Sequence, residues 1–317
     1  MIAGLDRGRV RGGLGCGGVG VGVLVRRVAV YGALEHLGRF LVVRVGGGRV
    51  WSLPGGPVAH AEHPERAVVR TIAEQTGLTV SVARLRSVVA DVDASASDGI
   101  SVHTDRLLFE TTVLGDVPEV TDGGTVEARW VSPEAATGLP LTPFSAELLG
   151  LPVVPLRADA YPSAEPLPTS HPDRRLRFGA YGLVTDPAGR ILLTQIAEGY
   201  PGAGKWHLPG GGTDHGEQPT AGLLRELVEE GGQVGRVVKL LGVDNLHNPA
   251  ALGPEGRPLD WHGVRVIYRV LVDVPTDALV TESAGGSTAR AGWFTAAEAA
   301  DLPLTGIAAS AIGQLGS

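Results

Sequence analysis

The sequence predicts an α/β fold in which one layered unit occurs twice along the chain. The first observation behind this prediction is an internal repeat: Trp51–Gly56 (Trp-Ser-Leu-Pro-Gly-Gly) recurs 155 residues later as Trp206–Gly211 (Trp-His-Leu-Pro-Gly-Gly). The second is that runs of β-branched residues alternate with segments of helical spacing within each copy. Strands interleaved with helices in one small unit indicate helices layered on a sheet.

The repeat extends far beyond the shared hexapeptide. A Trp followed by Leu-Pro-Leu-Thr occurs at Trp130 and again at Trp293, 163 residues later, so about eight residues are added within the second copy. Similarity that recurs in the same order over this length indicates a duplicated unit. The offset of 155 residues also relates four pairs of identical residues: Glu62 and Glu217, Arg70 and Arg225, Glu74 and Glu229, and Gly77 and Gly232.

The repeat divides the chain into four segments. Residues 1–22 are a Gly-rich stretch that we expect to be a flexible leader. The two copies occupy residues 23–150 and 174–317. Between them, residues 151–173 contain six prolines and lack helical or strand periodicity, which favours an extended linker.

Strands are predicted where β-branched runs are bounded by turn residues. In the first copy these runs are Val19–Tyr31, Arg39–Val45, Val80–Ala90 and Arg106–Leu114. In the second copy they are Phe178–Val184, Ile191–Ile196, Val237–Val243 and Val264–Val272.

Helices are predicted at equivalent places in the two copies. Pro64–Gln75 and Pro219–Glu230 each have proline near the start and glycine just past the end, which is the expected asymmetry of helix termini. The Leu-Pro-Gly-Gly sequence before each of them is predicted to be a loop. A short helix is expected after Trp130 and after Trp293.

The composition limits the classes of function. Lys and Arg total 27 and Asp and Glu total 34, so the net charge of −7 argues against a surface built to bind long nucleic acid. The chain has one cysteine, Cys16, which excludes an internal disulfide framework, and no apolar run reaches the roughly 20 residues of a membrane helix. We therefore expect a cytoplasmic protein, without a membrane partner, that acts on small ligands.

Acidic residues are concentrated on the second predicted helix. Glu226, Glu229 and Glu230 are three and four positions apart, so their carboxylates are expected on one helix face. Like charges this close repel one another unless a cation lies among them, and oxygen ligands select hard ions such as Mg²⁺ or Mn²⁺. Glu217 is placed to join them, and Arg225 to pair with a carboxylate.

A metal ion at this position can bridge phosphate oxygens and lower the pKa of an attacking water. Gly210, Gly211 and Gly212 leave room for the backbone to approach the metal or the phosphates, which makes them candidate substrate-binding residues. The alternative interpretation is a solvated acidic helix face. We favour the metal site, because the glycines, the loop carboxylate and the arginine occur together.

The spacing resembles the signature of the Nudix hydrolase family. That signature runs Gly, five residues, Glu, seven residues, then Arg-Glu-aliphatic-any-Glu-Glu-any-Gly-aliphatic. Gln233 departs from it, since an aliphatic residue is expected there. The positions that match are Gly211, Glu217, Arg225, Glu226, Leu227, Glu229, Glu230 and Gly232.

The resemblance implies an α/β/α sandwich with a mixed sheet that hydrolyses a nucleoside diphosphate linked to another moiety. It implies that Glu229 and Glu230 are the principal metal ligands, that Glu226 is a further ligand or the water-activating base, and that Glu217 is a supporting ligand. Arg225 would orient the carboxylates. The general base in this family often lies outside the signature, and the unranked candidates are Glu255, Asp260 and Glu282.

The first copy keeps the spacing of the signature and loses part of its charge. Thr71 and Gln75 replace the first and last carboxylates of the helix, while Glu62 and Glu74 remain. We therefore expect weak metal binding and little or no catalysis in this copy. A ligand pocket, a contribution to the other copy's substrate site and a purely structural role all remain open.

Other residues of the second copy are candidates for substrate contact. We predict a polar loop that contains His247–Pro249 and Asp260–His262, with His262 as a substrate-binding residue. Pro249 lies 17 residues after Gly232, a spacing similar to that of ADP-ribose-hydrolysing family members. Trp206, like Trp51, is expected in the core.

The sequence leaves several alternatives open. The leading hypothesis is a pyrophosphohydrolase whose substrate is a small nucleotide, such as ADP-ribose or a nucleoside triphosphate, including an oxidised one. The alternative is a nucleotide-binding or sensing protein with incidental or no catalysis. Both a monomer and a homodimer are compatible with the duplication.

Overall fold

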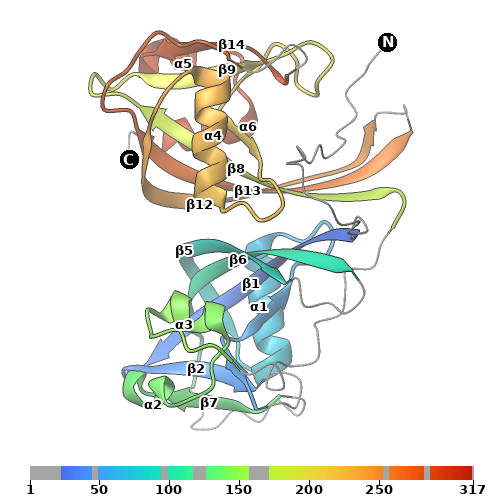
Figure 1. Ribbon diagram of the computed structural model, residues 1–317, viewed down its shortest axis with the longest axis vertical. Coiled ribbons are helices and arrows are strands. Elements are labelled where there is room, and N and C mark those ends of the chain that lie inside the picture. Colours follow the sequence, from blue (N-terminus) through green and yellow to red (C-terminus); the bar gives the residue numbers. More distant parts are fainter. Residues whose placement is uncertain are drawn as a thin grey trace, which may run out of the picture. The chain divides into compact units, whose positions relative to one another are not determined.

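The chain forms two compact units in a computed structural model. The structure describes residues 23–44, 49–93, 99–116, 126–156, 171–252, 257–281 and 286–315. The first unit is Leu24–Ser170 and the second contains His171–Ser317 (Figure 1). The predicted leader, 1–22, and most of the predicted linker lie outside the described residues, so those two assignments stay predictions.

The first unit is built on one sheet with the strand order β3-β2-β1-β6-β5, in which β4 also pairs with β1 and β7 with β2. Its strands are β1 (Val23–His36), β2 (Arg39–Arg44), β3 (Trp51–Ser52), β4 (Gly55–Pro57), β5 (Val80–Asp93), β6 (Ile100–Val113) and β7 (Ala128–Val131). Its helices are α1 (Pro64–Thr76), α2 (Pro133–Thr137) and α3 (Pro143–Leu149).

The second unit repeats this topology, with the strand order β10-β9-β8-β13-β12 and with β11 paired to β8 and β14 to β9. Its strands are β8 (Arg174–Thr185), β9 (Ile191–Ile196), β10 (Trp206–His207), β11 (Gly210–Gly212), β12 (Arg236–Leu252), β13 (Pro258–Leu271) and β14 (Thr288–Phe294). Its helices are α4 (Pro219–Gly231), α5 (Ala296–Ala300) and α6 (Gly306–Gly313). Because β13 is parallel to β8 and β12 antiparallel to β13, the sheet is mixed, as predicted.

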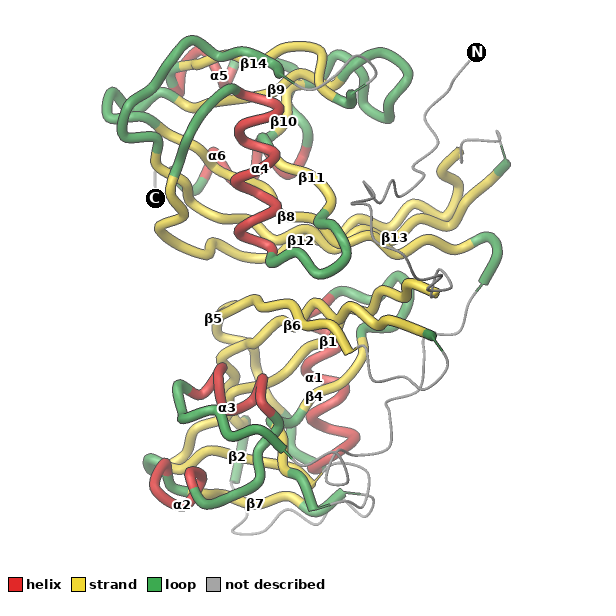
Figure 2. The backbone as a smooth tube through the Cα atoms, viewed as in Figure 1, coloured by secondary structure: helices red, strands yellow, loops and turns green. Residues whose placement is uncertain are grey.

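Helices cover both faces of each sheet. In the second unit, Tyr181 packs against the core cluster that contains α6, whereas a Cβ on Gly182 would lie 3.3 Å from Leu223 of α4. Successive strand residues point to opposite faces, so α4 and α6 lie on opposite sides (Figures 1 and 2). In the first unit, Tyr31 contacts Phe144 of α3, and a Cβ on the next residue, Gly32, would lie 2.5 Å from Ile72 of α1. The helices α3 and α1 therefore also lie on opposite faces of their sheet. The predicted α/β/α sandwich is confirmed.

The two repeated motifs meet in the core of each unit. Trp51 and Trp206 are 3% and 5% exposed, which confirms their predicted place in the core. Each tryptophan forms an isolated parallel bridge with the Leu-Pro-Leu-Thr motif of its own unit, Trp51 with Leu141 and Trp206 with Leu304. The two motifs recur together because their backbones are hydrogen-bonded to each other.

Two predicted loops are wrong. Gly210–Gly212 forms β11, paired with Tyr181, Ala180 and Gly179 of β8. The polar residues 247–249 and 260–262 belong to a long β12–β13 ladder, whose pairs include His247 with His262. Sequence periodicity missed this extension because polar side chains and Pro249 interrupt the β-branched run, while the backbone pairing continues through register shifts.

The helices begin and end close to their predicted residues where a cap is present. α1 and α4 each span 13 residues and end at a glycine in the left-handed region, Gly77 at φ +71° and Gly232 at φ +66°. The short helices α3 and α6 were not predicted. None of the helices in the described residues has the length and apolar character needed to cross a lipid bilayer.

Candidate active site

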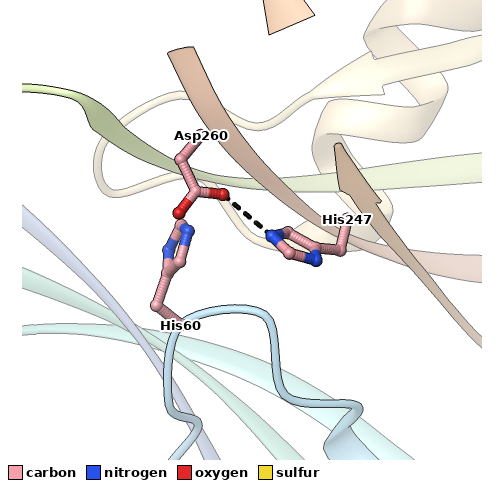
Figure 3. Close-up of side chains that lie close together, drawn as sticks. All are labelled: His60, His247 and Asp260. Atoms are coloured by element: carbon pink, nitrogen blue, oxygen red, sulfur yellow. Dashed lines mark hydrogen bonds and ion pairs between the residues drawn. The ribbon is translucent and has the colours of Figure 1, made fainter. Parts of the chain in front are cut away.

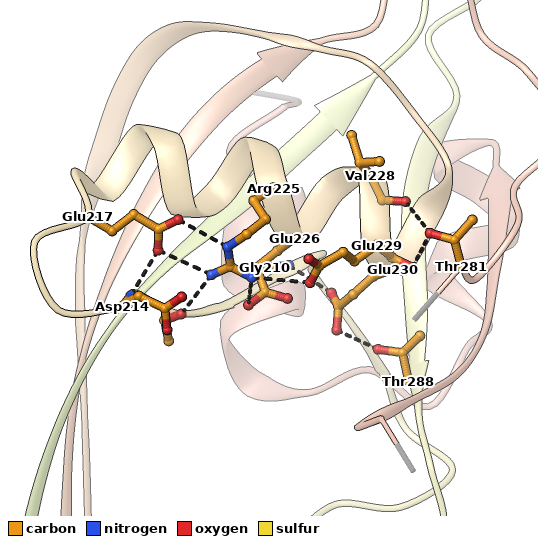
Figure 4. A network of polar contacts seen from close by, with 11 residues as sticks. Gly210, Asp214, Glu217, Arg225, Glu226, Val228, Glu229, Glu230, Thr281 and Thr288 are labelled. Atoms are coloured by element: carbon orange, nitrogen blue, oxygen red, sulfur yellow. Dashed lines mark hydrogen bonds and ion pairs between the residues drawn. The ribbon is translucent and has the colours of Figure 1, made fainter. Parts of the chain in front are cut away.

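Helix α4 buries one side and presents charged residues on the other. Leu223 and Leu227 are fully buried against the sheet. The C-terminal carbonyl groups of α4 are capped by the segment that precedes β14: the amide of Thr281 donates to Glu229 O at 2.8 Å, and its hydroxyl contacts Val228 O at 3.1 Å (Figure 4). The C-terminal end of the carboxylate-bearing turn is therefore fixed.

Arg225 gathers the acidic residues of the signature (Figure 4). Its Nε and Nη2 donate to the two carboxylate oxygens of Glu217 at 3.0 and 3.2 Å. Its Nη1 donates to Glu226 Oε1 at 3.0 Å and to Glu229 Oε2 at 3.1 Å. One guanidinium thus contacts three carboxylates, which fixes their orientation as the resemblance implies.

The charges around Arg225 are unbalanced. The hydrogen bond with Glu217 raises the pKa of Arg225 above its ordinary value, although burial lowers it, and Coulombic attraction to Glu226 and Glu217 raises it further. Arg225 is therefore a permanent cation. A single positive charge among three carboxylates leaves net negative charge on this surface.

Glu230 occupies a different environment from the other carboxylates. It is 4% exposed, whereas the side chain of Glu229 is 40% exposed. Its Oε2 accepts a hydrogen bond from the amide of Gly210 at 2.9 Å, and its Oε1 accepts one from the hydroxyl of Thr288 on β14. Glu230 therefore ties α4 to β11 and β14, in addition to any role as a ligand.

Glycines allow the carboxylates to lie against the backbone. A Cβ on Gly211 would lie 2.9 Å from Glu226 Oε1, and one on Gly222 would lie 2.8 Å from Glu217 Oε2. Gly210 has φ +131°, and a Cβ there would lie 2.3 Å from the carbonyl oxygen of Ala180. Sequence analysis identified the glycines of β11 but missed Gly222, because a glycine inside a helix has no local signal for a contact with a distant loop.

The donor set fits a hard divalent cation. Glu217, Glu226 and Glu229 bring partly exposed carboxylates to the Arg225 guanidinium, and Glu230 adds a buried carboxylate directly after Glu229. Oxygen ligands with surplus negative charge are those that Mg²⁺ and Mn²⁺ prefer. These four residues are therefore the candidate ligands for such an ion.

Gln233, the departure from the signature, is a buried polar clamp. It is 1% exposed, its Nε2 donates to the carbonyl of Gly231 at 2.9 Å, and its Oε1 accepts from the amide of Thr276 at 3.0 Å. It therefore attaches the end of α4 to the segment that leads toward β14. The sequence identified Gln233 as a departure from the signature and gave no sign of this hydrogen-bonded role.

The remaining candidates that the structure describes lie on the β12–β13 ladder. His262 lies within β13, between His247 on one side and Leu176 on the other, with its Nε2 2.7 Å from Asn245 Oδ1. Asp260 shares a hydrogen bond of 2.8 Å with His247 (Figure 3). The other candidate bases, Glu255 and Glu282, lie outside the described residues.

The first unit repeats the arginine-centred arrangement. Arg70 Nε and Nη2 donate to the two oxygens of Glu62 at 2.8 Å each, and its Nη1 donates to Glu74 Oε2 at 3.1 Å. The hydrogen bond with Glu62 raises the pKa of Arg70, against the effect of burial. Two carboxylates surround this arginine instead of three.

The two residues that stand in place of carboxylates in the first unit form hydrogen bonds with the backbone. The hydroxyl of Thr71 donates to Ala67 O at 2.9 Å, within its own helix. Gln75 accepts from the amide of Gly55 at 2.9 Å and donates to the carbonyl of the same residue at 2.8 Å. Gln75 thus takes the place of Glu230. It is neutral, and it forms hydrogen bonds with Gly55, the counterpart of Gly210.

Family comparison agrees with the duplication. The model of the family described as the NUDIX domain matches residues 23–150 and 174–313. A MutT-like protein from Streptomyces ambofaciens is 29% identical over 139 residues, which are 44% of this chain and 79% of that protein. An 8-oxo-dGTP diphosphatase from Haemophilus influenzae is 42% identical over 62 residues, which are 20% of this chain and 46% of that protein.

Solved structures are similar to single units of the chain. A MutT NUDIX hydrolase from Burkholderia pseudomallei is 29% identical with a TM-score of 0.34, over 39% of this chain and 96% of that one. The NUDIX domain of Shewanella oneidensis NrtR, solved in complex with ADP ribose, is 20% identical with a TM-score of 0.36, over 44% of this chain and 86% of that one.

Proposed function

This chain belongs to the NUDIX domain family, which matches both of its units, and from that premise we propose that the second unit is the catalytic half of a Nudix hydrolase. The reaction is hydrolysis of a phosphoanhydride bond in a nucleoside diphosphate linked to another moiety. The observation that carries the proposal is the convergence of Glu217, Glu226 and Glu229 on Arg225, with Glu230 fixed on the glycine strand.

Each residue has a role that follows from its contacts. Arg225 holds the carboxylates of Glu217, Glu226 and Glu229 in one orientation before substrate arrives. Glu230 keeps Gly210 and the rest of β11 at a fixed distance from α4. The absence of side chains on β11 leaves its backbone open to the phosphates.

Mg²⁺ or Mn²⁺, when bound by these carboxylates, would neutralise charge on the phosphates and lower the pKa of the attacking water. The Oε1 of Glu226 accepts a hydrogen bond from Arg225, which holds this carboxylate beside Gly211, and we assign Glu226 as a metal ligand or as the base that accepts the proton of water. Glu229 is the most exposed of the three carboxylates around Arg225, which supports its assignment as a principal metal ligand.

The substrate is proposed as a small nucleotide. The curated relative from Haemophilus influenzae acts on 8-oxo-dGTP, and one similar solved domain binds ADP ribose. These two ligands share a phosphoanhydride, which is the group that the carboxylate cluster is suited to. A substrate panel therefore includes ADP-ribose, NADH, diadenosine polyphosphates and ordinary and oxidised nucleoside triphosphates.

The test is hydrolysis of this panel by the purified full chain with Mg²⁺, with Mn²⁺ and with EDTA. We expect release of a nucleoside monophosphate or phosphate from at least one compound when metal is present, and none with EDTA. If no compound of the panel is hydrolysed with either metal, the enzyme proposal is contradicted and the nucleotide-binding alternative is favoured.

The duplication supplies a matched control for the catalytic residues. Glu229→Gln is expected to lower kcat by about 1000-fold, since it removes a charge at the proposed metal site. Glu74→Gln makes the same change at the equivalent position of the first unit and should leave kcat within about twofold. Equal losses in the two variants would place catalysis elsewhere.

A further inference from the structure

A cation lies directly beside the glycine strand β11. A Cβ built on Gly212 would lie 2.6 Å from Arg177 Nε and 2.7 Å from its Nη2, so the guanidinium rests on that glycine. Arg177 is exposed, and it makes no hydrogen bond or ion pair with any other residue in the ranges that the structure describes. Its charge is therefore available to a ligand.

Glu226 lies on the other side of the same strand, one residue away. A Cβ on Gly211 would lie 2.9 Å from Glu226 Oε1. Consecutive strand residues point to opposite faces, and their Cα atoms are about 3.8 Å apart. The carboxylate and the guanidinium of Arg177 are thus separated by a strip of backbone that carries no side chains. A diphosphate beside Glu226 can extend over this strip to Arg177.

Another arginine on the same face of the sheet as Arg177 is already paired with a carboxylate. Gly212 pairs with Gly179 of β8, and Gly179 pairs in turn with Arg265 of β13. Arg265 forms an ion pair with Asp244 of β12, through its Nε at 2.6 Å. Of these two cations, Arg177 is the one whose charge is not opposed by a carboxylate within the described residues.

The first unit shows what happens to this arginine when the carboxylates are lost. The ladder partners Ala29 and Pro57 correspond to Gly179 and Gly212, which makes Arg27 the counterpart of Arg177. The Nη2 of Arg27 donates to the hydroxyl of Thr104 at 3.1 Å and the residue is buried. A proline ring occupies the place of the bare glycine. The first unit therefore lacks both the acidic cluster and an exposed arginine at this position.

We propose that Arg177 binds a phosphate oxygen of the substrate, across β11 from the carboxylate cluster. The planar guanidinium suits this role, since it can donate two parallel hydrogen bonds to phosphate oxygens. This inference rests on the proposed function of the second unit. It assigns to Arg177 a part in substrate affinity, with no part in proton transfer.

The first test compares Arg177→Gln with Arg175→Gln. Arg175 is also exposed and lies two residues earlier on β8, on the same face, so it is a control for the change in net charge. We expect Arg177→Gln to raise KM about 10-fold while kcat stays within about twofold, since hydrogen bonds to charged groups are worth about that factor. Arg175→Gln should leave both constants unchanged.

Binding of inorganic pyrophosphate in the presence of Mg²⁺, measured by isothermal titration calorimetry, gives a readout that does not depend on turnover. The Kd should rise about 10-fold in Arg177→Gln and not in Arg175→Gln. If no nucleotide is hydrolysed by the wild type, the proposed function fails and this titration still decides the role of Arg177. Equal Kd values for wild type and both variants would overturn the inference.

A double-mutant cycle tests whether the position over Gly212 matters. Gly212→Ala would place a Cβ 2.6 Å from Arg177 Nε and so displace the guanidinium without changing charge. We expect Gly212→Ala alone to raise KM, and to add nothing in the Arg177→Gln background, because both changes remove one contact. Additive effects would show that Arg177 and Gly212 act independently and would overturn the proposed geometry.

Discussion

The two units share a topology and differ in the side chain that is hydrogen-bonded to an equivalent glycine. In the second unit the amide of Gly210 donates to the carboxylate of Glu230, while in the first the amide and the carbonyl of Gly55 both bond to the amide group of Gln75. The neutral side chain satisfies both backbone groups of Gly55, and the charged one accepts from the amide of Gly210 and the hydroxyl of Thr288. The acid at this position is therefore not needed to build the fold, which supports a chemical role for it.

The arginine at the centre of each site leads to the same conclusion. Arg225 contacts three carboxylates and Arg70 contacts two, yet both keep the bidentate contact with the loop glutamate. Thr71, in the place of Glu226, bonds to its own helix. The structural part of the arrangement, which anchors the loop to the helix, has been retained in both units. The surplus charge has been retained in the second unit alone.

Exchanging residues between the units should have the largest effect. The double change Glu226→Thr and Glu230→Gln gives the second unit the residues of the first. We expect kcat to fall by at least about 1000-fold, a loss of roughly 4 kcal/mol of transition-state stabilisation. The measurement is steady-state hydrolysis of the best substrate of the panel, with circular dichroism to verify folding. Activity within tenfold of the wild type would refute the assignment of the two sites.

The reciprocal exchange sharpens this comparison. Thr71→Glu with Gln75→Glu restores four acidic positions to the first unit, and we expect a new Mn²⁺ site that titration calorimetry or electron paramagnetic resonance detects. The second unit, inactivated by Glu229→Gln, provides the background. The absence of any added Mn²⁺ binding would show that the first unit has lost more than charge.

Removing the amide of Gln75 should destabilise the first unit. Gln75→Ala leaves the partly buried amide and carbonyl of Gly55 without their partner, and we expect a loss of about 2–3 kcal/mol in the free energy of unfolding of that unit. Urea unfolding followed by hydrogen exchange of its peptides measures this. Glu74→Ala, at a side chain that is 60% exposed, is the control and should cost less than about 0.5 kcal/mol. Equal losses would contradict the role of Gln75.

A histidine in the second unit should make it more sensitive to acid than the first. Burial, and to a smaller extent the charge of Arg265, lower the pKa of His207 to about 4, whereas the equivalent residue of the first unit is Ser52. The unfolded chain binds a proton near pH 6.5, so stability is lost as the pH falls from about 6.5 to 4. We expect a loss of about 2 kcal/mol in the second unit, since His207 keeps some exposure.

Hydrogen exchange of peptides from each unit, measured against urea at several pH values, checks this prediction. His207→Ser introduces the residue of the first unit and should flatten the pH dependence of the second unit over this window. A slope that survives this substitution would assign the acid sensitivity to another group.

The sequence predicted the duplication and the main strands because both depend on local patterns. It predicted the carboxylates because their spacing is fixed by the helix. It did not predict that Glu230 turns away to Gly210, nor that Gln233 clamps the end of α4, since these contacts join residues 20 and 43 positions apart. It missed Arg177 for the same reason, because only the pairing of β8 with β11 brings that arginine to Gly212.

The first hairpins of the two units differ, and this difference gives the smallest predicted effect. The β1–β2 turn places Leu37 at φ +49° and Gly38 at φ +71°, and the side chain of Leu37 is 87% exposed. The corresponding turn of the second unit uses Gly189 at φ +78°. A leucine in the left-handed region is strained, and asparagine is preferred at the first position of such a two-residue turn.

Leu37→Asn should therefore stabilise the first unit by about 0.5 kcal/mol, because it relieves backbone strain and removes no buried contact. Leu37→Ala keeps a Cβ without the local hydrogen bonding of asparagine and should change the free energy of unfolding by much less. Leu37→Val adds a branch at Cβ, which is disfavoured in this region, and should destabilise. Urea unfolding of the three variants measures these differences. Equal free energies of unfolding for Leu37→Ala and Leu37→Asn would contradict the prediction, since the turn conformation would then not limit the stability of this hairpin.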